Sequence, residues 1–194
     1  TTADQFLAAL EGWPGILANE AIAVRCERDL GLFCLAYFPE RFGSAFNALH
    51  LDFLARPKAP WSRRRKPRRY ADAAPRGFAK STIVSFASVV HDIIYGSEAY
   101  IGLISTTRDL SDKLVEDVFD VFTSPEAYPD VHRDFGPFRT KGTKTDFVVY
   151  VPGQDARGVR VKAFSFGTTI RGEKHAGIRP TKIVVDDGEH PEKV

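Results

Sequence analysis

Apolar residues recur at helical spacing through the first third of the chain. They predict helical structure over residues 3–24, interrupted near Trp13-Pro14-Gly15, and again over residues 26–38 as far as Pro39. A further short helix is predicted for residues 44–54. We therefore expect residues 1–56 to form an N-terminal helical region that leads into the main fold.

From Tyr70 onwards, short apolar runs alternate with longer amphipathic segments. Predicted strands cover residues 69–74, 99–106, 146–151, 158–166 and 181–187, and predicted helices cover residues 80–96 and 109–124. Asp109 or Ser111 is placed to cap the second of these helices. Strands that alternate with helices favour an α/β fold with a mostly parallel central sheet flanked by helices.

Residues 57–69 break this pattern with prolines and a dense run of positive charge, so we interpret them as a basic linker or loop before a core of residues 70–194. Such a run can follow DNA phosphates, although a solvated loop explains it equally well. No aromatic residues alternate with it to stack on bases. Lys141 and Lys144 are a weaker second candidate for DNA contact. The basic residues of the run are Arg63, Arg64, Arg65, Lys66, Arg68 and Arg69.

Composition narrows the class of protein. The chain has 194 residues, of which 43% are hydrophobic, and this suits one globular domain with a substantial core. It contains no apolar run of 18 or more residues and no secretion signal at its start, so we expect neither a membrane span nor export. The net charge of +2 does not by itself indicate nucleic acid. Cys26 and Cys34 lie among apolar residues and are expected to be reduced core thiols.

The most informative segment ends in Lys80-Ser81 and opens a predicted helix. It has the order of a phosphate-binding loop, G-x-x-x-x-G-K-[ST], but alanine stands at both glycine positions. Gly77 can still adopt a positive φ inside the loop. We expect the nucleotide to be bound by residues Ala74, Pro75, Arg76, Gly77, Phe78, Ala79, Lys80, Ser81 and Thr82.

This chemistry requires backbone N–H groups at a helix N-terminus, a lysine for the β- and γ-phosphate oxygens and a hydroxyl for Mg²⁺. Lys80 and Ser81 supply the last two. The expected cofactors are therefore ATP and Mg²⁺. The alternative interpretation is an ordinary helix start with a lysine and a serine in its first turn.

A second motif, KIVVDDGEH, supports the nucleotide-binding interpretation. Its β-branched run ends in Asp186, which we expect to hold Mg²⁺, because buried carboxylates are costly unless they face a cation. Asp187 and Glu189 are both candidates for the general base that orients the attacking water, and the sequence does not separate them. A strand followed by an acidic turn is the alternative.

Transfer of a phosphoryl group also needs a cation near the transferring phosphate. Arg76, inside the loop, could act in the same subunit or reach a neighbouring one. Arg171 and Arg179 lie in a glycine-containing segment that leads into the acidic strand, and they are further candidates. A surface ion pair is the alternative role for each arginine.

The segments APRGFAKST and RGEKHAGIRPTKIVVDDGE, together with YFPERFGSAFNALHLDFL upstream, resemble the ATPase domain of the large terminase subunit of tailed bacteriophages. The resemblance covers roughly residues 30–190 and implies a P-loop NTPase fold of the ASCE type. It also implies a motor that uses ATP hydrolysis to move double-stranded DNA into a procapsid. His50, upstream of the loop, is a weak candidate for an adenine pocket.

The resemblance further implies location in the host cytoplasm at the portal vertex, with the portal protein and the small terminase subunit as partners. A homo-oligomeric ring, expected to be a pentamer, would assemble on the procapsid, while the isolated domain could be a monomer. Terminases continue past the acidic strand into a nuclease domain. Because this sequence stops at Val194, we expect a C-terminally truncated ATPase core without nuclease activity.

Two other functions remain open at this point. A helicase-like P-loop ATPase on nucleic acid would share Lys80 and Asp186 but not the terminase-like flanks. A DNA-binding or assembly module that does not hydrolyse ATP would explain Ala74 and Ala79, although it gives no reason for the clustered acids near Asp186.

Overall fold

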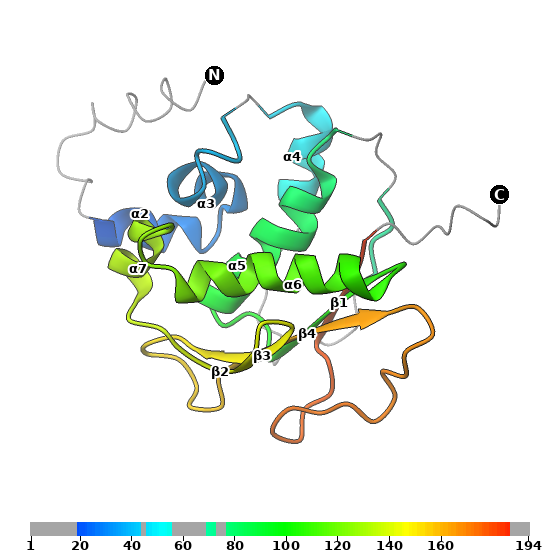
Figure 1. The fold of residues 1–194 in the computed structure, drawn as a ribbon. Helices are drawn as coiled ribbons and strands as arrows, with labels where there is room; N and C mark the ends of the chain where they lie inside the picture. The colour runs from blue at the N-terminus through cyan, green and yellow to red at the C-terminus, as the bar shows by residue number, and fades with distance from the viewer. Residues whose placement is uncertain (1–18, 44–45, 56–68, 73–76, 187–194) are drawn as a thin grey trace. The chain divides into compact units, whose positions relative to one another are not determined.

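The computed structural model describes residues 19–43, 46–55, 69–72 and 77–186. The chain divides into two compact units, the first formed by residues 1–58 and 68–91 and the second by residues 59–67 and 92–194. Figure 1 identifies the helices and strands of both units.

The first unit is helical. Its helices are α2 (Asn19–Cys26), α3 (Leu30–Tyr37) and α4 (Ala48–Leu54), followed by the π-helix η2 (Thr82–Ala87) and the start of α5 (Ser88–Ile94). The predicted helix over residues 26–38 is divided, because the Asp29 carboxylate accepts a hydrogen bond from the backbone N–H of Leu32 at 2.9 Å and caps a new helix. The helix predicted for residues 44–54 begins only at Ala48, after Asn47 caps it.

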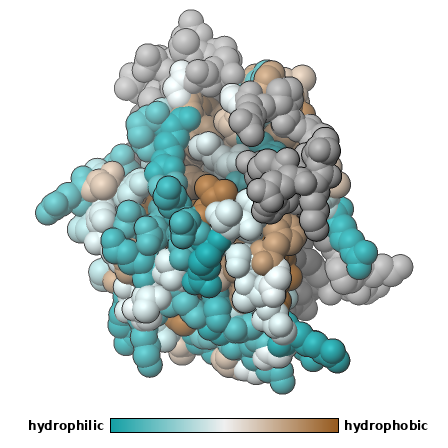
Figure 2. Space-filling model, turned by 45° about the vertical axis from the view of Figure 1, so that its right-hand side comes forward, coloured by the Kyte–Doolittle hydropathy of each residue, from teal (hydrophilic) through white to brown (hydrophobic). Residues whose placement is uncertain are grey.

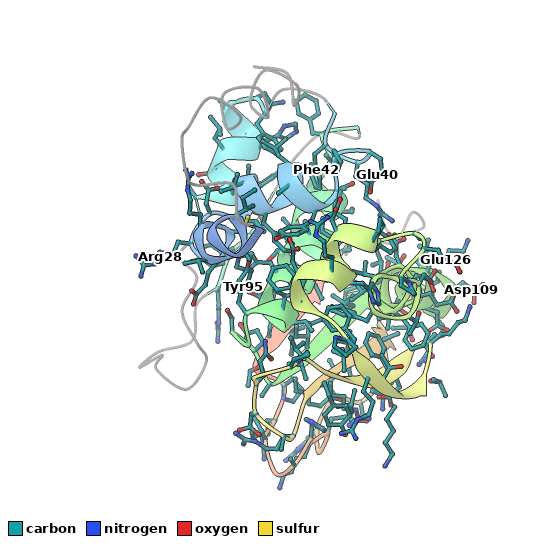
Figure 3. All side chains as sticks on the ribbon, turned by 90° about the vertical axis from the view of Figure 1, so that its left-hand side faces the viewer. Arg28, Glu40, Phe42, Tyr95, Asp109 and Glu126 are labelled. Atoms are coloured by element: carbon teal, nitrogen blue, oxygen red, sulfur yellow. The ribbon has the colours of Figure 1, made fainter. Side chains whose placement is uncertain are left out.

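Aromatic rings form the core of this unit. Phe38 contacts Phe33 and Phe86 edge-on, with ring centroids 5.6 and 5.1 Å apart. Cys26 and Cys34 are buried and form no disulfide, as the sequence predicts. Figure 3 shows the side chains of the described residues as sticks and labels Phe42, which is buried at 4% exposure.

One predicted strand is wrong over the residues that the structure describes. Residues 69–72 adopt neither strand nor helix, and Arg69, Tyr70 and Ala71 are exposed. The alternation of apolar and polar residues is too short here to require pairing with a sheet. The remainder of that predicted strand, residues 73–74, lies outside the described residues.

The second unit contains a five-stranded sheet in the order β2-β3-β4-β1-β5. β1 is parallel to both β4 and β5, whereas β2–β3 and β3–β4 are antiparallel. The fold is therefore α/β with a mixed sheet, and the prediction of a mostly parallel sheet holds only for β4, β1 and β5. The strands are β1 (Tyr100–Ser105), β2 (Arg139–Thr143), β3 (Asp146–Tyr150), β4 (Val159–Ser165) and β5 (Lys182–Val185).

Helix α6 (Arg108–Thr123) packs against one face of this sheet (Figure 1), where Phe119 meets Phe147 with ring centroids 5.0 Å apart. Thr107 caps it by accepting the N–H of Leu110, so the predicted caps Asp109 and Ser111 lie inside the helix. Thr107 is extended and precedes the first helical residue, as the capping position requires.

The opposite face carries a small apolar cluster of Tyr100, Ile104 and Phe164, against which Ile170 packs. Gly102 makes room for it, because a Cβ atom there would lie 3.2 Å from the Phe164 ring. Next to this cluster, Ile183 and Val185 of β5 remain about half exposed, at 49% and 52%.

The connection from β4 to β5 crosses this face of the sheet. Since β4 and β5 lie on either side of β1 and run parallel to it, residues 166–181 must pass over β1. Such connections usually contain a helix. In this protein residues 166–181 form no helix, and we call them the crossover loop.

Apolar side chains are only locally exposed on the face drawn in Figure 2, where hydrophilic positions predominate. None of the helices in the described part of the chain combines the length and the apolar character needed to cross a membrane.

Candidate functional site

The predicted phosphate loop enters its helix through two left-handed residues. Gly77 has a φ of +84° and Ala79 a φ of +48°. The Ala79 carbonyl accepts the N–H of Ile83 at 2.9 Å, and helical structure begins at Lys80. Alanine seldom adopts a positive φ, whereas glycine does so freely. Ala79 therefore has the backbone conformation for which a glycine would be expected at this motif position.

The helix that follows starts with a widened turn. Residues 82–87 form the π-helix η2, after which α5 continues to Ile94. The N–H of Ser88 is directed at the carbonyls of both Ile83 and Phe86. Short π-helical segments occur often at functional sites, so this feature marks the region without assigning it a ligand.

His50 supports the phosphate loop from α4, within the same unit. Its Nδ1 accepts the backbone N–H of Asn47 at 3.3 Å, which leaves Nε2 to donate to the Phe78 carbonyl at 3.1 Å. Asn47 in turn accepts the N–H of His50 at 3.0 Å and completes a capping box. Both ring nitrogens of His50 thus have protein partners, and the side chain links α4 to the loop.

Several predicted site residues lie outside the described residues. These are Ala74, Pro75 and Arg76 in the phosphate loop, Asp187 and Glu189 after β5, and the basic residues 63–68. Arg69 is described and exposed.

Asp186 directly follows β5 in the second unit. Its N–H donates to the Ile104 carbonyl at 2.9 Å, which continues the β1–β5 pairing by one step, and the residue is only 8% exposed. The register places it level with Ser105, at the carboxyl ends of the parallel strands. This edge is where α/β sheets commonly bind ligands.

The described residues contain no group of three or more His, Cys, Asp and Glu side chains arranged to hold a metal ion. The Ser81 hydroxyl and the Asp186 carboxylate are nevertheless hard oxygen donors of the kind that Mg²⁺ prefers. Ser81 belongs to the first unit and Asp186 to the second.

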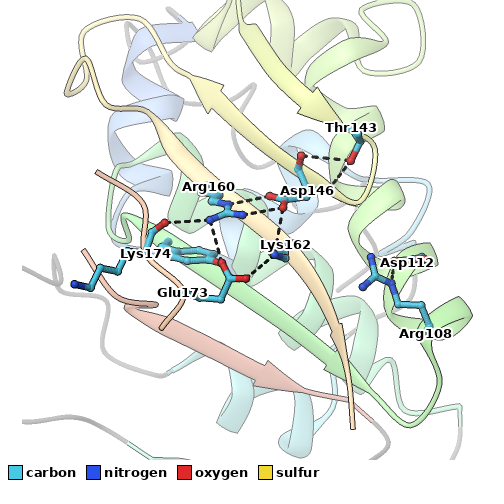
Figure 4. A network of polar contacts seen from close by, with 9 residues as sticks. Arg108, Asp112, Thr143, Asp146, Arg160, Lys162, Glu173 and Lys174 are labelled. Carbon is cyan, nitrogen blue, oxygen red and sulfur yellow. Dashed lines mark hydrogen bonds and ion pairs between the residues drawn. The ribbon is translucent and has the colours of Figure 1, made fainter. Parts of the chain in front are cut away.

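A polar network fastens the crossover loop to the sheet (Figure 4). The Glu173 carboxylate accepts hydrogen bonds from Lys162 at 2.7 Å, from the Tyr100 hydroxyl at 3.0 Å and from Arg160 at 3.2 Å. Arg160 also donates to both carboxylate oxygens of Asp146, each at 2.8 Å. Arg160 and Lys162 of β4 thus lie between two carboxylates, one from β3 and one from the loop.

Charge and burial shift the pKa values in this network. The hydrogen bond from Lys162 is the main cause that holds the pKa of Glu173 below its ordinary value. Burial would raise the pKa of Asp146, but the hydrogen bonds and charge of Arg160, together with Lys162, lower it overall. Burial is the main cause that raises the pKa of Tyr100, so its hydroxyl stays protonated and donates to Glu173.

The remaining predicted cations are on the surface of the second unit. Arg171 and Arg179 are exposed in the crossover loop, and Lys141 and Lys144 are exposed in and beside the β2–β3 hairpin. Phe78, which belongs to the first unit, is 37% exposed, so the phosphate loop carries a partly exposed aromatic ring.

Comparison with protein-family models, with curated proteins and with solved structures finds no match to this chain. The functional interpretation therefore depends on the residues themselves and on their geometry.

Sequence reasoning missed the Glu173 network and the support from His50. One signal was present in β4, where Arg160 and Lys162 occupy one face of a strand whose other face carries Val159 and Val161. Two cations on the same face of a half-buried strand need carboxylate partners. The partners come from residues distant in sequence, which the pattern does not identify.

Proposed function

We propose that this chain is the ATPase domain of a viral DNA-packaging motor, with a P-loop NTPase fold of the ASCE type. In this proposal it couples hydrolysis of Mg-ATP to the movement of double-stranded DNA into a procapsid. The observation that carries the proposal is the left-handed Ala79 immediately before the helix that begins with Lys80 and Ser81. Strained backbone of this kind persists where the surrounding structure holds it and often accompanies function.

Two further observations support the proposal. The α/β fold has a parallel strand, β5, that is followed directly by the mostly buried Asp186. The sequences around the loop and around this strand resemble those of the large terminase subunit. A carboxylate directly after a parallel strand is the expected partner of a magnesium ion at such a site.

Each residue has a defined role in the proposal. The backbone N–H groups of the first helical turn and the Lys80 ammonium bind the phosphates, and Ser81 and Asp186 hold Mg²⁺, which would neutralise charge on the phosphate oxygens. Either Asp187 or Glu189 orients the attacking water by accepting its hydrogen bond. Arg76 stabilises the charge that develops on the phosphoryl group.

The proposed partners follow from the terminase resemblance alone. They are double-stranded DNA, the portal protein, the small terminase subunit and further copies of this chain in a ring at the portal vertex, in the host cytoplasm.

Calorimetric titration of the 194-residue chain with Mg²⁺ and a non-hydrolysable ATP analogue tests the phosphate loop. We expect binding by the wild type and none by Lys80→Ala. Lys113→Ala, which removes an exposed lysine from α6, is the matched control and should bind like the wild type. Equal binding by wild type and Lys80→Ala would refute the phosphate-loop assignment, as would no binding by either.

DNA-stimulated hydrolysis then distinguishes the motor from a module that binds nucleotide without hydrolysing it. Binding to a portal ring distinguishes the motor from a helicase-like ATPase, which would show stimulated hydrolysis without that partner.

A further inference from the structure

The crossover loop has an uneven charge distribution. Residues 166–181 contain three basic residues, Arg171, Lys174 and Arg179, and one acidic residue, Glu173. Glu173 is directed at the sheet, where Lys162, Arg160 and Tyr100 surround its carboxylate. The negative charge of the loop is therefore neutralised internally, whereas Arg171, Lys174 and Arg179 are exposed.

These three cations differ from three exposed arginines of the same unit that form ion pairs. Arg108 pairs with Asp112, Arg133 with Asp134 and Arg157 with Asp155. Among the residues that the structure describes, no ion pair involves the side chain of Arg171, Lys174 or Arg179. Surface cations that lack local carboxylates are available to an external anion without first breaking an ion pair.

The backbone that carries these cations is held in place. Next to Glu173, the Lys174 carbonyl accepts a hydrogen bond from Arg160 at 3.1 Å, and His175 Nε2 contacts the Arg157 carbonyl at 2.9 Å. His175 and Ile178 exchange two backbone hydrogen bonds of 2.8 Å around a tight turn. Ala176, at a φ of +47°, and Gly177, at +82°, form the tip of that turn.

A segment of this length without a helix or strand is uncommon in a compact unit unless it has a function. Its exposed charges are of one sign and its chemistry offers no base-stacking platform, because its aromatic residue, Phe166, lies at the opposite end from the turn. Such a surface suits the regularly spaced phosphates of a nucleic acid backbone, which bind by charge and not by sequence.

We propose that the crossover loop is a contact surface for the phosphate backbone of duplex DNA, made by Arg171, Lys174 and Arg179 and held in place by Glu173. This inference deepens the proposed function by assigning a site to the DNA. Its test uses no nucleotide, so its failure and the failure of the ATPase assignment are distinguishable.

The experiment measures binding of the 194-residue chain to a fluorescent duplex of arbitrary sequence by anisotropy, over a series of salt concentrations. The variant Arg171→Ala/Lys174→Ala/Arg179→Ala is compared with Arg108→Ala/Lys113→Ala/Arg133→Ala. Both variants lose the same positive charge from the same unit, but the control changes helices α6 and α7 (Pro129–Phe135) instead of the loop. Thermal melts of both variants check that they fold.

We expect the loop variant to bind duplex DNA roughly tenfold or more weakly at low salt. The slope of log affinity against log salt should also fall in magnitude by about 2 to 3, since each lost phosphate contact removes about 0.9 from that slope. The control should stay within about twofold of the wild type. Equal weakening of the two variants would overturn the proposal, because net charge alone would then explain it. Unchanged DNA binding by the loop variant would also overturn it.

The variant Glu173→Gln tests whether Glu173 holds the crossover loop in place. Removing a negative charge should tighten DNA binding if charge alone matters. If Glu173 holds the three cations in a fixed arrangement, Glu173→Gln should instead weaken binding, and the loop should exchange its amide hydrogens faster. Tighter binding by this variant would overturn the role that we assign to Glu173.

Discussion

The phosphate loop and the crossover loop each contain an alanine with a left-handed backbone, Ala79 and Ala176, yet they use that conformation differently. Ala79 leads directly into a helix, whose first backbone N–H groups favour anions. Ala176 forms the tip of a tight turn with no helix after it, so the crossover loop gathers charged side chains instead. In the two proposals above, the same local strain would serve two kinds of anion recognition.

The supports of the two loops differ as well. Nε2 of His50 holds the phosphate loop through one hydrogen bond to the Phe78 carbonyl. The crossover loop is held by Glu173, which accepts hydrogen bonds from two cations and a hydroxyl. Hydrogen bonds that involve charged groups are about twice as strong as neutral ones, so the crossover loop should be the more firmly fixed.

Removing the side chain that supports each loop should give the largest difference in the free energy of unfolding. We expect Glu173→Ala to lower the free energy of unfolding by about 2 kcal/mol, because charge-assisted hydrogen bonds at a partly exposed site are lost, and His50→Ala by about 1 kcal/mol. Urea denaturation measures both. Asp155→Ala, at a fully exposed ion pair, is the control and should leave the midpoint unchanged. A greater loss for His50→Ala than for Glu173→Ala would reverse the comparison.

Acid should weaken the crossover loop in a defined direction. The folded state lowers the pKa values of Glu173 and Asp146, so their contribution to stability is fully present above the ordinary carboxyl pKa and is lost as pH falls through the lowered values. The difference in urea midpoint between wild type and Glu173→Gln should therefore shrink as pH decreases from about 5 to about 3. A difference that stays constant over this range would show that the Glu173 charge contributes nothing.

Replacing the strained alanines should produce the smallest effect and the opposite sign. Ala79→Gly and Ala176→Gly should each stabilise the protein by about 0.5 kcal/mol, because glycine relieves a left-handed strain of about 1 kcal/mol while adding some freedom to the unfolded chain. Ala156→Gly, at an exposed turn without a positive φ, should destabilise slightly. Calorimetric melting measures all three variants, and destabilisation by Ala79→Gly would argue against a strained phosphate loop.

Much of the fold was predictable because its signals are local. The helix capped at Thr107 and the strands β1, β3, β4 and β5 follow apolar patterns that the sequence displays clearly. β2 and α7 were missed because their sequences, RTKGT and PDVHRDF, lack a continuous apolar face and depend on tertiary partners. The antiparallel β3–β4 pairing made the sheet mixed, since the short connection at residues 151–158 allows a hairpin but no parallel crossover.

In the candidate site too, local signals could be read from the sequence, whereas contacts between distant residues could not. Lys80, Ser81 and Asp186 could be proposed from the sequence because a loop, a helix and an acidic strand end follow one another in motif order. Glu173 was not, because its partners come from β1 and β4, and such contacts appear only when strands distant in sequence are placed next to each other. The left-handed φ of Ala79 was also not deducible from residue type, because alanine normally avoids it.

The attachment at Glu173 has a consequence for the chain as a polymer. A connection that is fixed only at its two ends samples many shapes, and the entropy of closing it grows with the logarithm of its length. Glu173 lies near the middle of residues 166–181 and divides them into two short arcs, each attached at both ends. The arc after Glu173 is shortened again by the His175–Ile178 pairing. A long connection therefore behaves as a series of short ones, and little conformational entropy is left to lose when a ligand arrives.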